Sequence, residues 1–128
     1  MVIRHGDIRW FRFRAPDKRR PVLVVARPEL LPSLSLVPVI PISTQIRGLP
    51  HEVLFDEADR LRERSTLKPE WIRAVSPACL GPFIASLAEH RWSEVRTAVL
   101  HVLGLDRLCK DATRRVNAPP LPERRRVA

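Results

Sequence analysis

The chain has 128 residues and a mass of 14.7 kDa, which is room for one domain with one hydrophobic core. Its 45% hydrophobic content excludes a globally disordered chain, and two cysteines are too few for a disulfide scaffold or a four-ligand zinc site. Lys and Arg number 23 against 14 Asp and Glu, so the formal net charge is +9, which favours a polyanionic partner such as nucleic acid.

The positive charge is concentrated at the two ends. Residues 1–20 hold seven Lys and Arg against two Asp, residues 106–128 hold seven against three acidic residues, and residues 21–105 are neutral. This distribution fits a basic face for phosphates, and equally fits solvated charges without a specific role. No apolar run approaches the roughly 18 residues of a membrane helix, and the N-terminus lacks a signal-peptide core. We therefore expect a cytoplasmic protein without membrane contact.

Period-two and β-branched patterns predict about five short strands in the first two thirds of the chain. Residues 6–14 alternate apolar and basic residues, and residues 21–26 form a continuous apolar run typical of a buried strand. Residues 36–43 are also apolar, but two prolines predict an edge or irregularly paired strand. A strand over 51–55 and a broken strand over 66–75 follow. Residues 15–18 predict a turn, and short helical turns fit 27–36 and 56–64.

One helix is predicted near the end of the chain. Ser86 to Glu89 has the pattern of a capping box, apolar residues recur with helical spacing from Trp92 to Leu103, and Gly104 is a natural stop. Residues 106–128 are basic and proline-rich, so we expect an extension that starts helical and ends disordered. The fold class is therefore α+β, a small barrel or twisted sheet followed by a helix, with residues 1–105 as the domain.

Four segments then occur in an order and spacing that resemble one family. They are Gly6–Ile8, the run RPVLVV from Arg20, the stretch PISTQ from Pro41 with GLPHEV after it, and Ser65–Arg73. Over residues 2 to about 105 the chain resembles the MazF/PemK (Kid) toxins of bacterial type II toxin–antitoxin systems. The resemblance implies a small SH3-like β-barrel of the CcdB/Kid/MazF type with a C-terminal α-helix, a homodimer, and a cognate antitoxin as partner.

The resemblance also implies an activity, the metal-independent, sequence-specific cleavage of single-stranded RNA. In the family the RNA's own 2′-OH attacks the phosphate, which leaves a 2′,3′-cyclic phosphate and a 5′-OH, and no cofactor takes part. Arg20 matches the family's catalytic arginine, and its guanidinium can place two N–H donors on a phosphorane. Ser43 takes the usual threonine position, and Glu70 takes the acidic position as a general base.

Each of these residues also has a structural interpretation. Arg20 can simply end a basic run, Ser43 can end a strand, and Glu70 can form an ion pair with Lys68 two residues away. The further candidates for RNA binding are Arg19, Thr44, Gln45, Lys68, Trp71 and Arg73.

Two departures from the family pattern keep other functions open. Trp71 replaces the usual glutamine, and can stack on a base or fill a dimer interface. The first loop is shortened to about residues 14–19, and it lacks the histidine that serves catalysis in Kid-like members. We expect His51, His90 and His101 to be structural or surface residues, and His5 lies too far upstream to replace the loop histidine. The alternatives are an inactive toxin-like module that binds RNA or DNA, and a CcdB-like toxin directed at gyrase.

Overall fold

The computed structural model describes residues 2–13 and 19–107. Its strands are β1 (Asp7–Arg12), β2 (Arg19–Val24), β3 (Val37–Ser43), β4 (Val53–Phe55), β5 (Ser65–Leu67), β6 (Arg73–Val75) and β7 (Leu80–Ser86), and its α-helix is α1 (Trp92–Leu103). Short 3₁₀ turns lie between them, among them η2 (Glu57–Asp59), η3 (Pro69–Trp71) and η5 (Glu89–Arg91). The predicted turn over 15–18 and most of the extension 106–128 lie outside the described residues.

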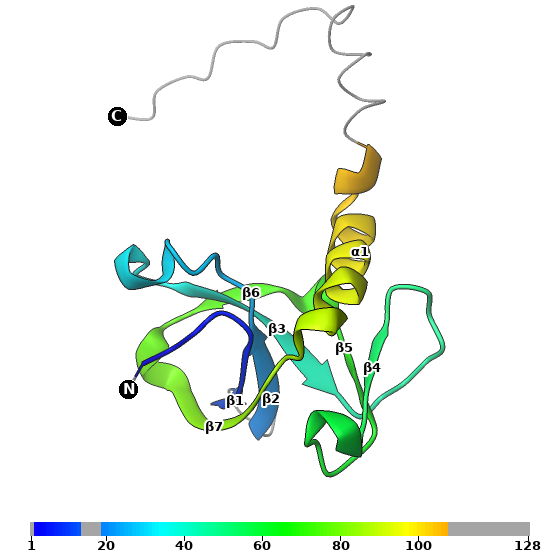
Figure 1. The fold of residues 1–128 in the computed structure, drawn as a ribbon, viewed down its shortest axis with the longest axis horizontal. Coiled ribbons are helices and arrows are strands. Elements are labelled where there is room, and N and C mark those ends of the chain that lie inside the picture. The colour runs from blue at the N-terminus through cyan, green and yellow to red at the C-terminus, as the bar shows by residue number, and fades with distance from the viewer. Residues whose placement is uncertain (1, 14–18, 108–128) are drawn as a thin grey trace, which may run out of the picture.

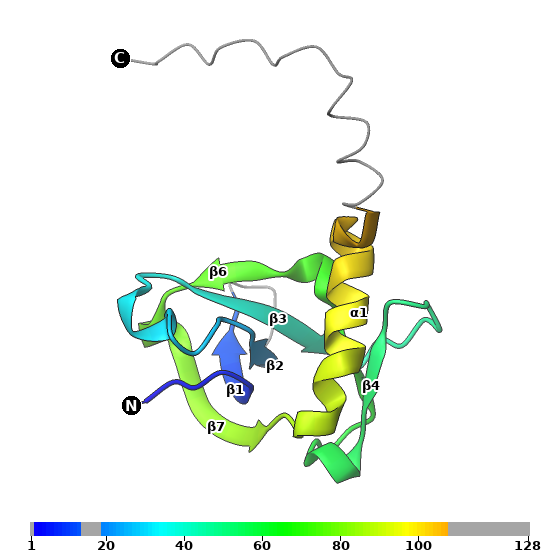
Figure 2. The same ribbon diagram turned by 45° about the horizontal axis from the view of Figure 1, so that its top comes forward.

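The strands form one curved antiparallel sheet in the order β4-β5-β3-β2-β1-β7, with β6 paired to β3 (Figure 1). Among the described residues no pairing joins β4 to β7, so the sheet is open and the closed barrel expected from the resemblance is not formed. Helix α1 lies beside η3 and β4 (Figure 2). The α+β class and the single C-terminal helix are confirmed for this part of the chain.

Of the two arrangements that the prolines predicted for residues 36–43, the edge strand is not formed, and the irregularly paired strand is. Strand β3 is central, with β2 on one side and β5 and β6 on the other. Proline lacks an N–H but keeps its carbonyl, and both carbonyls are used: Val25 N–H donates to Pro38 O at 3.1 Å and Lys68 N–H to Pro41 O at 2.9 Å. The prolines therefore sit where the sheet needs acceptors only.

Buried side chains form two hydrophobic clusters against the sheet. One includes Ile8, Leu23, Ile40 and Phe55, against which Trp92 and Val99 of α1 pack. The other is built from valines of β2, β3 and β6 with Phe11 and Leu80. Because successive strand residues point to opposite faces, the unbroken apolar runs of β2 and β3 supply both clusters.

The start of the helix differs from the prediction and its end agrees with it. Ser86 is paired with Asp7 in the sheet, so it is not a cap, and α1 begins at Trp92 after η5 without a side-chain cap. The predicted capping box is therefore wrong, because strand pairing takes the backbone of Ser86. At the other end Gly104 has φ 70° and its N–H bonds the carbonyls of Leu100 and His101, as predicted for a glycine stop.

One basic residue of β1 is structural. Arg9 is buried, and its Nε donates to Asp7 Oδ2 at 3.0 Å while its Nη1 reaches the carbonyl of Gly81 at 3.1 Å. Arg9 therefore adds no positive charge to the surface of the N-terminal segment. The pair joins the start of β1 to β7.

Candidate active site

The sheet register brings the predicted site residues toward one end of the fold. Ser43 ends β3 and is paired with Thr66, so the chain that continues into Lys68 and η3 starts beside it. Arg20 enters from β2, which pairs with β3 through Val22 and Pro41. The side chain of Arg20 then reaches η3, since its guanidinium carbon lies 5.8 Å from the ring centre of Trp71. Three separate segments therefore converge on one short turn.

Arg20 has the properties expected of a residue that meets an anion. It is half-buried in β2, and among the described residues no carboxylate lies within ion-pair distance of it. Its contact with Trp71 positions the guanidinium through a cation–π interaction and leaves its N–H groups to other partners. Trp71 itself is 40% exposed, so its ring is partly open to solvent.

Further arginines lie over aromatic rings at the ends of β1, β2 and β6. Arg19 lies 4.3 Å over the ring of Trp10, and Arg73 lies 5.3 Å over Phe13 and 5.7 Å over Phe11. Arg19 is also directly opposite Arg12 in the strand register, a like-charge pairing that is unfavourable without a counterion. Sequence reasoning had singled out Arg19 and Arg73, but not the aromatic rings that hold them. The alternation of aromatic and basic residues in 10–13 is the signal that could have identified these rings.

The hydroxyl of Ser43 is buried and already has one partner. The residue is 6% exposed, and its Oγ accepts the N–H of Gln45 at 3.1 Å, which shapes the turn after β3. The hydroxyl hydrogen is still free to donate, because a serine oxygen can accept and donate at once. Thr44 and Gln45 are exposed on the loop that follows. Ser43 is thus the last residue of β3, and its hydroxyl keeps a donor for a further partner.

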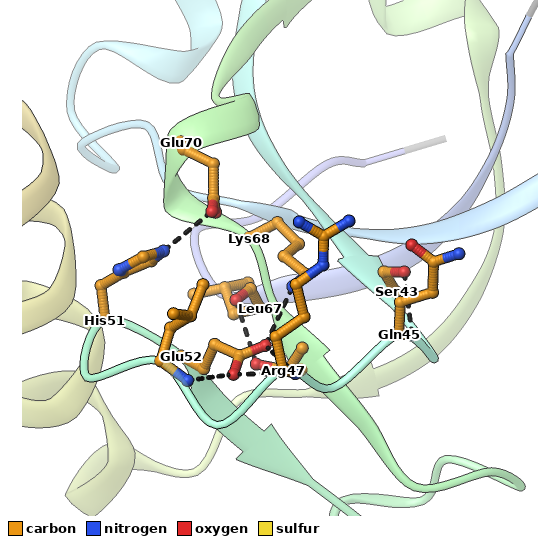
Figure 3. Close-up of polar contacts among 10 residues, drawn as sticks. Ser43, Gln45, Arg47, His51, Glu52, Leu67, Lys68 and Glu70 are labelled. Carbon is orange, nitrogen blue, oxygen red and sulfur yellow. Dashed lines mark hydrogen bonds and ion pairs between the residues drawn. The ribbon is translucent and has the colours of Figure 1, made fainter.

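Lys68 forms a buried ion pair with Glu52. Their side chains are 3% and 2% exposed, and Nζ donates to Oε2 at 2.9 Å (Figure 3). The carboxylate also accepts the backbone N–H of Leu49 at 2.7 Å and that of Arg47 at 3.1 Å. Burial raises the pKa of Glu52, but the hydrogen bonds from Lys68, Leu49 and Arg47 outweigh it and lower the pKa to about 2. Glu52 therefore holds the loop between β3 and β4 in place.

Glu70 pairs with His51 and not with Lys68. His51 Nε2 lies 2.8 Å from Glu70 Oε2, and the two side chains are 18% and 33% exposed (Figure 3). The alternative interpretation, an ion pair between Lys68 and Glu70, is not formed, because β5 ends at Leu67 and η3 turns Glu70 toward the β3–β4 loop. Sequence reasoning placed His51 among structural or surface residues, and its neighbours in the turn GLPHEV gave no sign of this partner.

The described residues contain no group of three or more His, Cys, Asp or Glu that could hold a metal ion. The helices of the same part of the chain include none that is long and apolar enough to cross a membrane.

The sequence of this chain is similar to those of known proteins. Residues 4–103 match the family described as PemK-like, MazF-like toxin of type II toxin–antitoxin systems. The chain is 34% identical over 95 residues to the probable endoribonuclease MazF5 of Mycobacterium tuberculosis, which covers 73% of this chain and 86% of that protein. It is 32% identical over 90 residues to endoribonuclease MazF3 of the same species, covering 70% and 87%.

Solved structures show the same fold. The M. tuberculosis toxin MazF-mt6 superposes with a TM-score of 0.70 at 28% identity, covering 77% of this chain and 96% of that one. A mycobacterial endoribonuclease determined in complex with its cognate antitoxin superposes with a TM-score of 0.71, covering 81% and 97%, and at 18% identity that likeness concerns the fold alone.

Proposed function

Because the chain belongs to the family of PemK-like, MazF-like toxins of type II toxin–antitoxin systems, we propose that it is a sequence-specific endoribonuclease that cleaves single-stranded RNA. Its relatives MazF5 and MazF3 are named endoribonucleases, which supports RNA cleavage as the activity. The protein works in the cytoplasm as a homodimer, and a cognate antitoxin blocks it. The reaction needs no metal, and its products carry a 2′,3′-cyclic phosphate and a 5′-OH.

The observation that carries this proposal is the position of Arg20. Arg20 is a half-buried residue, and its guanidinium, without a carboxylate partner among the described residues, is suited to bind a phosphate with two parallel N–H donors. During cleavage the phosphate gains a second negative charge, and fixed donors stabilise that charge more than they stabilise the substrate. Arg20 therefore acts as the electrostatic catalyst of the site. Arginine keeps its proton at any physiological pH and does not serve as a base.

Ser43 and Glu70 complete the proposed catalytic set. The hydroxyl of Ser43 donates its free hydrogen to a phosphate oxygen while the N–H of Gln45 fixes its orientation. Glu70 supplies the basic function on the η3 side of the site, where it removes the proton of the 2′-OH.

The RNA contacts extend from Arg20 along the arginine and aromatic pairs. Bases of single-stranded RNA stack on aromatic rings and on guanidinium planes, and phosphates attract the same guanidinium groups. Arg19 on Trp10 and Arg73 on Phe13 present such planes, and Trp71 offers a partly exposed ring. Thr44 and Gln45 are exposed on the adjacent loop, where they can contact bases. The ammonium group of Lys68 is bound to Glu52, so Lys68 acts on the RNA through Trp71, whose ring it contacts at 5.7 Å.

The test is incubation of the purified, antitoxin-free protein with a long single-stranded RNA in EDTA. Wild-type protein is expected to make discrete cuts with 5′-OH ends, and Arg20→Ala is expected to lower the rate by a factor of about 10²–10³, as for the loss of one oxyanion donor. Arg27→Ala removes an exposed arginine just after β2 and is the matched control that should keep full activity.

Intact RNA from folded wild-type protein in EDTA, with or without added Mg²⁺, would reject catalysis and leave an RNA-binding module. Cleavage that returns only with Mg²⁺ would reject the metal-independent reaction. Equal activity in Arg20→Ala and Arg27→Ala would reject the assignment of Arg20.

A further inference from the structure

The pair of His51 and Glu70 has the geometry of an oriented acid–base group. Glu70 is held on η3, where the N–H of Trp71 bonds the carbonyl of Lys68 at 2.9 Å. His51 is held on the other side by its neighbour Glu52, whose backbone N–H bonds the carbonyl of Leu49 at 3.1 Å and whose buried carboxylate fixes the loop. Both partners are thus attached to ordered backbone from two separate segments, and Figure 3 shows their side chains pointing toward one another.

The contact defines which ring nitrogen is free. A carboxylate only accepts hydrogen bonds, so the 2.8 Å contact requires the hydrogen of the imidazole to be on Nε2. No described residue bonds to Nδ1, the opposite nitrogen, which is the nitrogen that carries the lone pair when the ring is neutral. A carboxylate behind one nitrogen of an imidazole fixes its tautomer and stabilises the cation that forms when the other nitrogen takes a proton.

We infer that His51 is the general base of the cleavage reaction and that Glu70 is its positioning residue. This inference rests on the proposed function and changes one step of it: His51 removes the proton of the 2′-OH in place of Glu70, and Glu70 orients His51. The base and the phosphate-binding group meet on η3, which has only three residues: Arg20 contacts it through Trp71 and His51 contacts it through Glu70. The partly exposed His51 can reach a substrate hydroxyl, whereas the buried ammonium of Lys68 is bound to Glu52 and cannot exchange partners cheaply.

The proton and the electrons balance without a cofactor. Nδ1 of His51 takes the proton of the 2′-OH as that oxygen forms its bond to phosphorus, and Glu70 stabilises the resulting imidazolium. The bond from phosphorus to the 5′-oxygen breaks, and the leaving oxygen takes a proton from water. The products are the 2′,3′-cyclic phosphate and the 5′-OH, and His51 returns its proton to solvent.

The first experiment measures cleavage of a short RNA by His51→Ala, with His90→Ala as the matched control. His90 is an exposed histidine on η5 that has no hydrogen bond or ion pair among the described residues. His51→Ala is expected to be slower by a factor of about 10²–10⁴, the usual contribution of a general base, while His90→Ala keeps the wild-type rate. Added imidazole should restore part of the activity of His51→Ala, and more basic substituted imidazoles should restore more.

The second experiment separates positioning from a merely structural role of Glu70. If Glu70 acts only through His51, then Glu70→Gln slows the wild-type enzyme but has no further effect in His51→Ala. A structural role would instead add its cost in both backgrounds. Binding of a 2′-deoxy oligonucleotide, which cannot be cleaved, should change less than threefold in every variant. Should His51→Ala fail to fold by circular dichroism, His51→Gln replaces it in all comparisons.

The outcomes distinguish this inference from the proposed function. Wild-type protein that leaves RNA intact overturns both. An active wild type with His51→Ala or His51→Gln within threefold of it overturns the role of His51 alone. Restored activity of His51→Ala on RNA with a 5′-bridging sulfur, whose leaving group needs no proton, also overturns the assignment, because it would make His51 the general acid.

Discussion

Removing one charge of the buried ion pair between Glu52 and Lys68 should lower the free energy of unfolding strongly. Glu52→Gln keeps the size of the side chain and one acceptor oxygen for the N–H groups of Arg47 and Leu49, but it removes the charge that neutralises Lys68. Because Lys68 is 3% exposed, its ammonium group cannot turn to water. Breaking a buried ion pair on one side costs about 3–5 kcal/mol, since the remaining charge is left buried.

The effect can be measured by urea unfolding, which gives the free energy, and by thermal unfolding, which gives the melting temperature, both followed by circular dichroism. At this chain length 1 kcal/mol corresponds to roughly 4 °C, so we expect Glu52→Gln to lower the melting temperature by about 12–20 °C. Glu63→Gln, an exposed glutamate without a partner among the described residues, is the control and should stay within about 0.5 kcal/mol of wild type. The double variant Glu52→Gln with Lys68→Met should recover most of the loss, because it removes the orphaned charge as well.

Two results would refute this reasoning. A cost below about 1 kcal/mol for Glu52→Gln would mean that Lys68 finds solvent or another partner. A double variant no more stable than the single one would mean that the hydrogen bonds of the carboxylate to the loop, and not its charge, hold the fold.

Three further predictions concern acid stability, RNA affinity and the attachment of the helix. Because the pKa of Glu52 is lowered from 4.5 to about 2, the ionised carboxylate contributes fully to the free energy of unfolding above about pH 4.5, and this contribution is lost as the pH falls toward 2. The urea midpoints of wild type and Glu52→Gln should therefore converge on acidification. Midpoints that move apart would show that Glu52 does not stabilise the fold in its ionised form. Arg19→Ala should weaken binding of a 2′-deoxy oligonucleotide and lower the slope of log affinity against log salt concentration by about one, relative to the exposed control Arg62→Ala. An unchanged slope would show that Arg19 does not contact a phosphate. Arg91→Ala should lower the free energy of unfolding in urea by about 1–3 kcal/mol, because the guanidinium donates to Asp59 Oδ1 at 2.8 Å and to the carbonyl of Leu54 at 2.6 Å. A loss no larger than that of the exposed control Arg96→Ala would contradict this prediction.

The fold could be predicted where one local signal decides the structure. The apolar run of β2, the break of the strand at Pro69 and the stop at Gly104 each follow from the chemistry of a few neighbouring residues. The errors arose where a distant strand decides. The two prolines of β3 are tolerated centrally because their carbonyls meet donors from other segments, and the capping pattern at Ser86 is overridden by pairing with Asp7.

The candidate site was predictable as a set of residues but not as a set of partners. The resemblance to the toxin family indicated Arg20, Ser43 and Glu70, which stay predictions as catalytic residues, and the structure brings Arg20 and Glu70 to the same turn. The ion-pair partners of Lys68 and Glu70 could not be deduced from the sequence. Two residues that are two positions apart lie on the same face only where both belong to one continuous strand. Once η3 interrupts it, Lys68 points to Glu52 and Glu70 to His51.

The two pairs Glu52–Lys68 and His51–Glu70 connect the stability of the fold to the proposed chemistry. Glu52 is buried and does not meet solvent, yet it precedes β4 and follows His51 directly, so its carboxylate fixes the backbone that carries the base. A buried ion pair is a weak source of stability compared with apolar packing, because desolvation offsets most of its attraction. The pair matters because of where the carboxylate lies. Two apolar side chains in the same place would pack as well, but they could not accept the backbone N–H groups of Arg47 and Leu49. Glu52→Gln with Lys68→Met should therefore unfold like wild type and still cleave RNA more slowly, because the loop that aligns His51 with Glu70 is held by fewer and weaker bonds.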